Sequence, residues 1–331
     1  MKHGANIYKY AKVANCKVDE IIDFSSNINL YQPKCKVKTT NDLIVKYGDT
    51  SYKDLKKIIS KNYGVKKTQI SLFNGATSAI FALLNSLKLN KVYLYVPLYG
   101  EYEKAIPKTA KIKKIDRFKN IYKTPEKNST VIFVNPSTPD GKYYDLKKLF
   151  KIWQEQNCTV ILDESFLEFE NLPSLRQEIN NYKKLYIIQS FSKFFSCAGV
   201  RIGAVFSDKA NIKKLKQPIW NLSSFDAEFL TQRLNDKKFV KKTRELHKKQ
   251  KKELKKTLKN SKLFSKVYES DSNFFLVKNT KKTLFKYLLK HKILVRTCGS
   301  FDNLSDNYLR FAVKDKVSHK KLKEALREFH D

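Results

Sequence analysis

The sequence lacks the features that mark membrane, secreted and metal-binding proteins. No apolar run approaches the roughly 20 residues that a bilayer-spanning helix needs. The opening stretch, MKHGANIYKY, contains no apolar segment of the kind found in secretory signals. The five cysteines are scattered and odd in number, which indicates neither a disulfide framework nor a zinc site. These absences predict a cytoplasmic protein with no metal site and no membrane contact.

Acidic residues are also few relative to basic ones. Lys and Arg number 67 against 32 Asp and Glu, which gives a formal net charge of +35. A basic surface of this size is compatible with nucleic-acid binding, but the excess is mostly lysine and is spread along the chain. In the densest run, residues 237–262, apolar residues recur as in a long helix with one buried stripe and a solvated lysine face. The charge therefore predicts a solvated surface without a specific nucleic-acid partner. A basic nucleic-acid-binding protein without cofactor chemistry is kept as a remote alternative.

Short apolar runs alternate with helix-like segments through the middle of the chain. Apolar residues make up 41% of the 331 residues, enough for one large core and a smaller one. The runs lie at residues 69–75, 91–97, 130–136, 159–165, 184–190 and 202–207. Strands that are apolar on both faces and alternate with helices predict an α/β fold around a largely parallel sheet.

The pattern changes after the lysine-rich run, where the remaining segments are typical of a small α+β domain. We predict an N-terminal arm with a small-domain segment at 1–40, a large domain at 41–236 and a small C-terminal domain at 237–331. No internal repeat and no linker rich in Pro, Gly or Ser is found. The boundary near residue 236 is therefore predicted to lie within a continuous helix.

Residues suited to binding and catalysis follow the predicted strands. Binding sites in open parallel sheets gather beyond the carboxyl ends of the strands. The motifs at these ends are NGATSAI (74–80), VPLYGEY (96–102), VNPSTPDG (134–141), LDES (162–165) and SFSK (190–193). The amides of Gly75, Ala76 and Thr77, where a strand ends and a helix opens, favour a phosphate. Lys193 is unusual at the end of a core strand, because lysine is rarely buried without a partner.

These motifs, in this order, resemble those of the fold-type I pyridoxal-phosphate (PLP) enzymes. Within them, the chain resembles the branch that holds histidinol-phosphate aminotransferase and threonine-phosphate decarboxylase, and the resemblance covers nearly the whole chain. It implies a large domain with a mostly parallel seven-stranded sheet, a small α+β C-terminal domain, and PLP (pyridoxal 5'-phosphate) as the cofactor. It also implies a homodimer with active sites shared between the subunits.

The resemblance further implies which residues bind the cofactor. Lys193 would be the Schiff-base lysine, whose amine must be neutral to attack the aldehyde. Asp163 would pair with the pyridine nitrogen and keep it protonated. Tyr99 would stack on the ring, Thr138 would donate to the phenolic oxygen, and Tyr47 would reach the neighbouring subunit's cofactor. The residues implied to bind the phosphate are Ala76, Thr77, Ser190, Ser192 and Arg201.

Two positions depart from the aminotransferase pattern. Thr138, in NPSTPDG, replaces the family's asparagine, and its hydroxyl has a shorter reach toward the phenolic oxygen. Phe166, in DESFLEF, replaces the tyrosine common in aminotransferases, and phenylalanine is what the phosphothreonine decarboxylases tend to have. Both departures count against transamination more than against PLP binding.

Residues near the N-terminus and in the small domain indicate the kind of substrate. The segments HGANIY and DFSSNIN resemble the N-terminal part of the decarboxylase, which implies that His3, Gly4 and Asn27 line the substrate site. The small domain supplies Arg296 and Arg310. Two arginines and a histidine suit a small substrate that carries both a carboxylate and a phosphate.

The expected activity is therefore PLP-dependent decarboxylation of an O-phospho-L-amino acid. Phosphothreonine would yield (R)-1-amino-2-propanol phosphate for cobalamin biosynthesis, and phosphoserine would yield ethanolamine phosphate. The two substrates differ by one methyl group, so the sequence does not choose between them. The alternative activity is that of a histidinol-phosphate aminotransferase.

Overall fold

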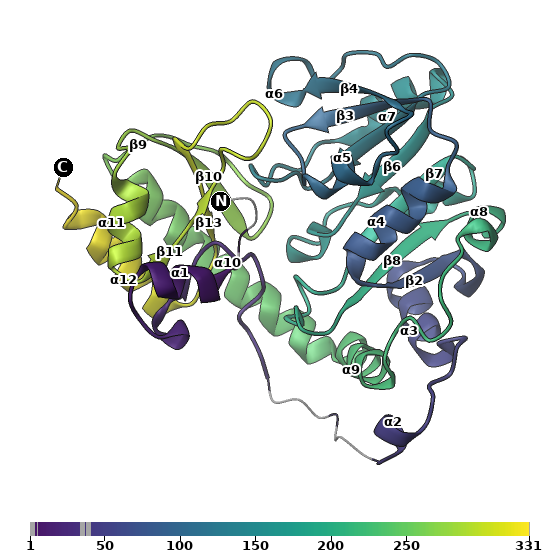
Figure 1. Ribbon diagram of the computed structural model, residues 1–331, viewed down its shortest axis with the longest axis horizontal. Helices are drawn as coiled ribbons and strands as arrows, with labels where there is room; N and C mark the ends of the chain where they lie inside the picture. The colour runs from purple at the N-terminus through teal and green to yellow at the C-terminus, as the bar shows by residue number, and fades with distance from the viewer. Residues whose placement is uncertain (1–3, 5, 34–36, 38–40, 331) are drawn as a thin grey trace.

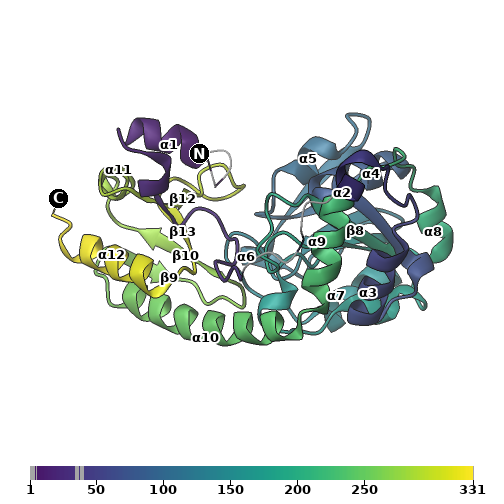
Figure 2. The ribbon, with the colours of Figure 1, turned by 90° about the horizontal axis from the view of Figure 1, so that it is seen from below.

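The computed structural model describes residues 4, 6–33, 37 and 41–330, which form two bodies connected by the long helix α10 (Lys237–Lys259) (Figure 1). The larger body is built on a seven-stranded sheet and the smaller body on a four-stranded sheet. Figure 2 shows α10 running along the smaller body after leaving the larger one.

The larger sheet is mostly parallel. Its strands are β2 (Ile70–Asn74), β3 (Lys91–Val96), β4 (Lys111–Asp116), β5 (Thr130–Val134), β6 (Thr159–Asp163), β7 (Leu185–Ser190) and β8 (Ile202–Ser207). They lie in the order β2-β8-β7-β6-β5-β3-β4, and only β8 runs antiparallel to its neighbours. The predicted mostly parallel seven-stranded sheet is confirmed. The carboxyl ends of every strand except β8 consequently meet at one edge.

Six of these strands coincide with the predicted apolar runs, whereas β4 is not among them. β4 reads KIKKID, and its first four residues are exposed. It lies at the edge of the sheet and pairs with β3. Lysines on an edge strand hinder pairing with another sheet, but they also remove the apolar signal by which a strand is predicted.

Helices cover both faces of this sheet. α4 (Gly75–Ser86) and α5 (Glu101–Ala105) share one buried apolar cluster with the strands, whereas α3 (Lys53–Tyr63) and α7 (Leu146–Glu155) contribute to another. The other helices of the larger body are α2 (Asn41–Val45), α6 (Arg117–Asn120), α8 (Lys209–Lys214) and α9 (Ser224–Asn235). Short 3-10 turns lie at Val18–Glu20, Lys67–Gln69, Leu167–Phe169 and Leu175–Ile179. The larger body is thus a three-layer α/β sandwich.

The smaller body combines the C-terminal region with the N-terminal segment. Its antiparallel sheet has the order β12-β13-β10-β9, formed by β9 (Phe264–Val267), β10 (Phe274–Asn279), β12 (Arg296–Thr297) and β13 (Tyr308–Ala312). β1 (Ile22–Asp23) pairs in parallel with β11 (Ile293–Leu294). The other helices here are α1 (Ile7–Val13), α11 (Leu284–Lys290) and α12 (Lys316–Arg327). The domain limits at residues 40 and 236 stay predictions.

The helical conformation is interrupted between α9 and α10, so the prediction of a continuous helix across residue 236 is wrong. Asp236 has φ −81° and ψ 83°, outside the helical range. Its side chain accepts a hydrogen bond from the Phe239 amide (2.9 Å) and caps α10. Aspartate competes with helical backbone bonding in this way, which favours a new helix start over a continued helix.

α10 itself has the predicted amphipathic pattern. Phe239, Thr243, His247, Leu254 and Leu258 are buried along one side. The exposed lysines are Lys237, Lys238, Lys241, Lys242, Lys248, Lys249, Lys252, Lys256 and Lys259. Although α10 is 23 residues long, neither it nor any other helix in the described ranges is long and apolar enough to cross a membrane.

The buried side of α10 should stabilise the smaller body. Leu254 is fully buried in its apolar cluster, so Leu254→Ala should lower the free energy of unfolding by about 2–5 kcal/mol through lost contacts and a cavity. The exposed Lys252→Ala, on the same helix, should change it by less than about 0.5 kcal/mol. Urea denaturation followed by circular dichroism measures both. Equal effects of the two substitutions would contradict the assignment of the buried side.

Candidate active site

Lys193 lies three residues beyond the end of β7, at the edge where the parallel strands end. Burial lowers the pKa of Lys193 to about 8, the positive charges of Arg201 and Arg310 add to this effect, and Asp163 opposes it. These four predicted residues, from separate parts of the sequence, are therefore close enough to interact. The amine of Lys193 is easier to deprotonate than that of an ordinary lysine.

Asp163 is the last residue of β6 and is buried. Its Oδ1 accepts a hydrogen bond from the Ser165 amide (2.9 Å), and its Oδ2 accepts one from the Tyr102 hydroxyl (2.8 Å). Burial raises the pKa of Asp163, while these hydrogen bonds and the Lys193 charge act in the opposite direction. Tyr102 was not predicted as a site residue, because a tyrosine that follows a core strand is also typical of a hydrophobic core.

The start of α4 faces β8 at very short range. Gly75 has φ +80°, and a Cβ there would lie 2.6 Å from Arg201 Nη2. A Cβ on Gly203 would lie 2.7 Å from the Cα of Ala76. Only glycine at both positions permits this approach. The amides at the start of α4 and the Arg201 guanidinium consequently share one small region.

The remaining predicted phosphate-binding residues belong to the same region. Ser190 pairs with Gly203 across β7 and β8. The hydroxyls of Ser190 and Ser192 are 2.9 Å apart. Thr77 follows Ala76 in the first turn of α4. The structure thus brings together the five residues predicted to bind a phosphate.

Thr138 lies in the buried loop that follows β5. Its hydroxyl accepts a hydrogen bond from Arg310 Nη1 (3.1 Å), and its carbonyl accepts one from Arg117 (3.1 Å). Arg117 also forms a buried ion pair with Asp140, whose carboxylate accepts a bond from the Ser137 hydroxyl (2.8 Å). Two arginine side chains, those of Arg310 and Arg117, therefore hold this loop at Thr138.

The two predicted substrate arginines lie directly opposite each other on neighbouring strands. Arg296 on β12 pairs with Arg310 on β13. Arg296 donates to the Ser300 hydroxyl (2.8 Å). The Arg310 guanidinium lies 4.8 Å from the Phe274 ring centre, and none of the described residues offers an acceptor to its buried Nε. Burial lowers the pKa of Arg310 to about 10, so it still carries its charge at neutral pH.

The segment at residues 24–27 joins the N-terminal region to these arginines. Its four consecutive carbonyls accept hydrogen bonds, in order, from Ala312 N (2.9 Å), Arg310 Nη2 (3.1 Å), Lys314 Nζ (2.8 Å) and Asn273 Nδ2 (2.7 Å). A Cβ on Gly4 would lie 2.5 Å from the Ser25 carbonyl oxygen. Gly4, Asn27 and Arg310 therefore lie around one segment. His3 lies outside the described residues.

Two of the predicted aromatic residues differ in their surroundings. Tyr99 is partly buried between β3 and α5. Tyr47 is 82% exposed, and its ring stacks on Trp220 with a centroid distance of 4.3 Å. No described contact joins Tyr47 to the other predicted site residues of the same chain.

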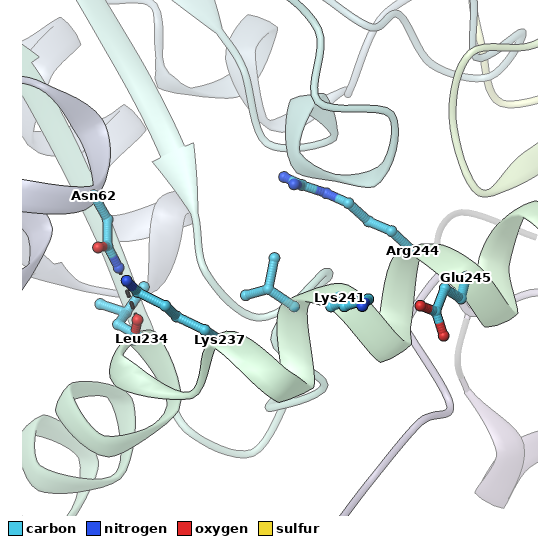
Figure 3. Close-up of a pocket in the computed structure, with 7 residues that line it drawn as sticks. Asn62, Leu234, Lys237, Lys241, Arg244 and Glu245 are labelled. Atoms are coloured by element: carbon cyan, nitrogen blue, oxygen red, sulfur yellow. Dashed lines mark hydrogen bonds between the residues drawn. The ribbon is translucent and has the colours of Figure 1, made fainter.

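A separate hollow lies where α3, α9 and α10 meet, and none of the predicted site residues lines it (Figure 3). Its lining residues are Asn62, Leu234, Lys237, Val240, Lys241, Arg244 and Glu245. Arg244 donates to the Glu168 carbonyl (3.1 Å) and lies 5.7 Å from the Phe194 ring centre. Through Phe194, this part of α10 supports the loop that carries Lys193.

Comparison with known proteins identifies the family. The family model for aminotransferase class I and II matches residues 19–329. The chain is 31% identical over 355 residues to the adenosylcobalamin biosynthesis bifunctional protein CobDQ of Leptospira interrogans; the match covers 98% of this chain but only 40% of that protein. It is 25% identical to the threonine-phosphate decarboxylase of Salmonella typhimurium, covering 98% of this chain and 95% of that protein.

A solved structure agrees in fold over almost the whole chain. The histidinol-phosphate aminotransferase from Clostridium acetobutylicum superimposes with a TM-score of 0.82 and 31% identity, covering 92% of this chain and 97% of that one. The relatives thus include both decarboxylases and aminotransferases. The chain belongs to the aminotransferase class I and II family, with the fold-type I architecture and the PLP dependence of that family.

Proposed function

We propose that this chain is a PLP-dependent decarboxylase of an O-phospho-L-amino acid. The observation that carries the proposal is the contact of residues 24–27 with both Gly4 and Arg310. It brings the N-terminal motif that resembles the decarboxylases to the arginines of the smaller body. The Salmonella relative, a threonine-phosphate decarboxylase, supports this activity, and the Leptospira relative, an adenosylcobalamin biosynthesis protein, supports a role in cobalamin biosynthesis.

The residues present fit PLP. When bound, this cofactor supplies an electron-poor ring that accepts the electron pair of a broken bond at the substrate's α-carbon. Lys193, with its lowered pKa, would offer a neutral amine to the aldehyde. Asp163 would bind the ring nitrogen. The region where the start of α4 closely approaches Arg201 and Gly203 would take the phosphate.

The remaining cofactor contacts follow from the same geometry. The phosphate would be bound by the start of α4, the two serine hydroxyls and the arginine after β7: Ala76, Thr77, Ser190, Ser192 and Arg201. Tyr99 would lie against one face of the ring. Because the Thr138 hydroxyl already accepts a bond from Arg310, its own proton is available to donate to the phenolic oxygen of the cofactor.

Arg296 and Arg310 would hold the two anionic ends of the substrate, together with His3, and Asn27 would line the same space. Their task is orientation: the bond from the α-carbon to the carboxylate must stand perpendicular to the cofactor ring in order to break. Breaking this bond would release carbon dioxide without the bonding electron pair, which would remain with the α-carbon and the electron-poor ring described above. Lys193 would donate the proton that replaces the carboxylate on the α-carbon.

Phe166 adds support for decarboxylation. Its ring meets the Phe274 ring edge to face at 5.1 Å, and Phe274 in turn contacts the Arg310 guanidinium. The position thus forms an apolar wall beside the substrate arginine, without the hydroxyl that aminotransferases resembling this chain have there. An apolar wall strengthens the attraction between Arg310 and a substrate anion by excluding water.

A histidinol-phosphate aminotransferase is the second candidate. It is favoured by the similarity to the Clostridium acetobutylicum structure, whose identity of 31% equals that of the Leptospira relative. Incubating the enzyme with phosphothreonine, phosphoserine, or histidinol phosphate plus 2-oxoglutarate distinguishes the candidates. Release of carbon dioxide identifies the decarboxylase, and formation of glutamate identifies the aminotransferase.

We also propose that the enzyme is a homodimer. Tyr47 and Trp220 stack on each other in a cluster of exposed apolar residues. The cluster includes Ile44 (68% exposed), Val45 (77%) and Ile219 (67%). Exposed apolar patches commonly mark interfaces. A second copy seated here would allow Tyr47 to reach the cofactor of its partner, as the family resemblance implies.

The reaction of Lys193 with PLP should depend on pH. The protonated amine is unreactive, so covalent incorporation into the cofactor-free protein should rise with pH and level off above about 8, instead of above the ordinary lysine value of 10.5. Borohydride trapping followed by peptide mass spectrometry measures the labelled fraction. Lys193→Ala is the control and should trap no cofactor at this peptide. A profile that still rises steeply near pH 10 would contradict the lowered pKa.

Arg310→Ala should reduce kcat/KM for phosphothreonine or phosphoserine by roughly 30-fold to several thousand-fold, because it leaves a substrate anion unpaired in a buried site. PLP content, read from its visible absorbance, should be retained. The exposed Arg327→Ala, also in the smaller body, should have the activity of the unmodified enzyme. Faster turnover of histidinol phosphate than of either phospho-amino acid in the unmodified enzyme would instead favour the aminotransferase.

Mixed dimers should test the role of Tyr47. Tyr47→Ala and Lys193→Ala proteins should each be inactive or nearly so, but a hybrid dimer would contain one intact site. After unfolding and refolding as an equal mixture, about one quarter of the sites should be active. Activity of the mixture equal to the mean of the two separate proteins, or a fully active monomer in sedimentation, would refute the shared site.

A further inference from the structure

Tyr102 is a fully buried tyrosine whose hydroxyl meets the site carboxylate directly. It lies on α5, three residues after Tyr99, and donates its proton to Asp163 Oδ2 at 2.8 Å. Burial and the neighbouring Asp163 both raise the pKa of Tyr102 well above its ordinary value. The phenol therefore stays protonated and acts as a hydrogen-bond donor throughout the working pH range.

Asp163 accepts hydrogen bonds at both carboxylate oxygens, one from Tyr102 and one from the chain that follows β6. Its other oxygen, Oδ1, accepts from the Ser165 amide (2.9 Å). The Ser165 hydroxyl in turn accepts from the Ser190 amide (3.1 Å), at the end of the strand that leads to Lys193. Each carboxylate oxygen thus accepts a hydrogen bond from the described part of the chain and has lone-pair capacity for a further donor.

We propose that Tyr102 is a positioning residue that keeps the proton shared by Asp163 and the cofactor ring on the ring nitrogen. A hydrogen bond to a carboxylate stabilises its charged form and makes it a weaker base. With donors from Tyr102 and Ser165, Asp163 binds the ring as an anion without removing its proton. The inference rests on the PLP dependence of the family and is independent of the substrate proposed above.

Loss of the Tyr102 hydroxyl would move the shared proton from the ring nitrogen to Asp163. Burial already raises the pKa of Asp163, and the bond from Tyr102 counteracts this. Without that bond, the carboxylate becomes a stronger base, so the N–H bond of the ring breaks and an O–H bond forms on Asp163. The pair loses its opposite charges, with no net change of charge. A neutral ring nitrogen accepts electrons less readily and is bound less tightly.

The test uses pyridoxal 5'-phosphate labelled with ¹⁵N in the ring, bound to the full-length protein. In Tyr102→Phe, the ring-nitrogen NMR signal should shift toward that of unprotonated pyridine. Equilibrium dialysis should show PLP binding weakened roughly tenfold to a hundredfold, as for a lost hydrogen bond to a charged group. An unchanged nitrogen signal in Tyr102→Phe would overturn the proposal.

Tyr95→Phe is the matched control. Tyr95 is also buried, lies on β3, and its hydroxyl accepts a hydrogen bond from Trp153 Nε1 (2.9 Å) without contacting Asp163. Its loss should lower thermal stability much as Tyr102→Phe does, but should leave the nitrogen signal and PLP affinity unchanged. Equal changes of the nitrogen signal in both variants would show a purely structural effect and would also overturn the proposal.

A second substitution covers the case in which Tyr102→Phe fails to fold. Incorporation of 3,5-difluorotyrosine at position 102 keeps the hydroxyl and almost the same volume, but makes the phenol a stronger donor. The nitrogen signal should then move in the opposite direction, toward full protonation, or stay at that limit. A shift toward unprotonated pyridine would contradict the proposal. Because this readout needs no substrate, it is unaffected if the proposed decarboxylase activity is wrong.

Discussion

The hydrogen bonding of residues 24–29 is the constraint on which the candidate site depends. Four consecutive carbonyls of this segment accept bonds from the smaller body. Two residues later, the Asn29 amide donates to the carbonyl of Lys193 (3.0 Å), and its side chain donates to that of Phe194 (2.9 Å). One short segment therefore connects the strand that carries Arg310 with the loop that carries Lys193. This connection and the bond from Arg310 to Thr138 join the two bodies at the site.

Charge is distributed unevenly across the site. Arg201 and Arg310 are close enough to Lys193 to lower its pKa, while Asp163 is the carboxylate that opposes them. A buried cation such as Arg310 is costly unless an anion compensates for its charge. The phosphate of PLP and the anionic groups of a phosphorylated amino acid would supply the missing negative charge. The positive charges that favour such ligands thus also add to the effect of burial, which is the main cause of the lowered pKa of Lys193.

The large positive net charge of the chain comes mostly from surface lysines and not from the cations of the candidate site. On α10, the exposed lysines cover the side opposite the buried stripe, and two ion pairs join Lys255 and Lys259 to Glu269. Exposed pairs of this type contribute little to stability. The lysine-rich surface accordingly affects solubility more than chemistry, whereas the few cations near Asp163 determine the candidate site.

The sequence by itself determined the features that depend on neighbouring residues. Apolar runs predicted six strands, and the apolar stripe at residues 237–262 predicted the long helix α10. The unusual place of Lys193, at the end of a predicted core strand, identified it as a candidate site residue. Tertiary structure decided the rest. β4 is a strand because it pairs with β3, although its lysines conceal it. Tyr102 became a site residue only where α5 packs against the end of β6, 61 residues later in the chain. A side chain's partner depends on which distant element folds against it, and local patterns carry no information about that contact.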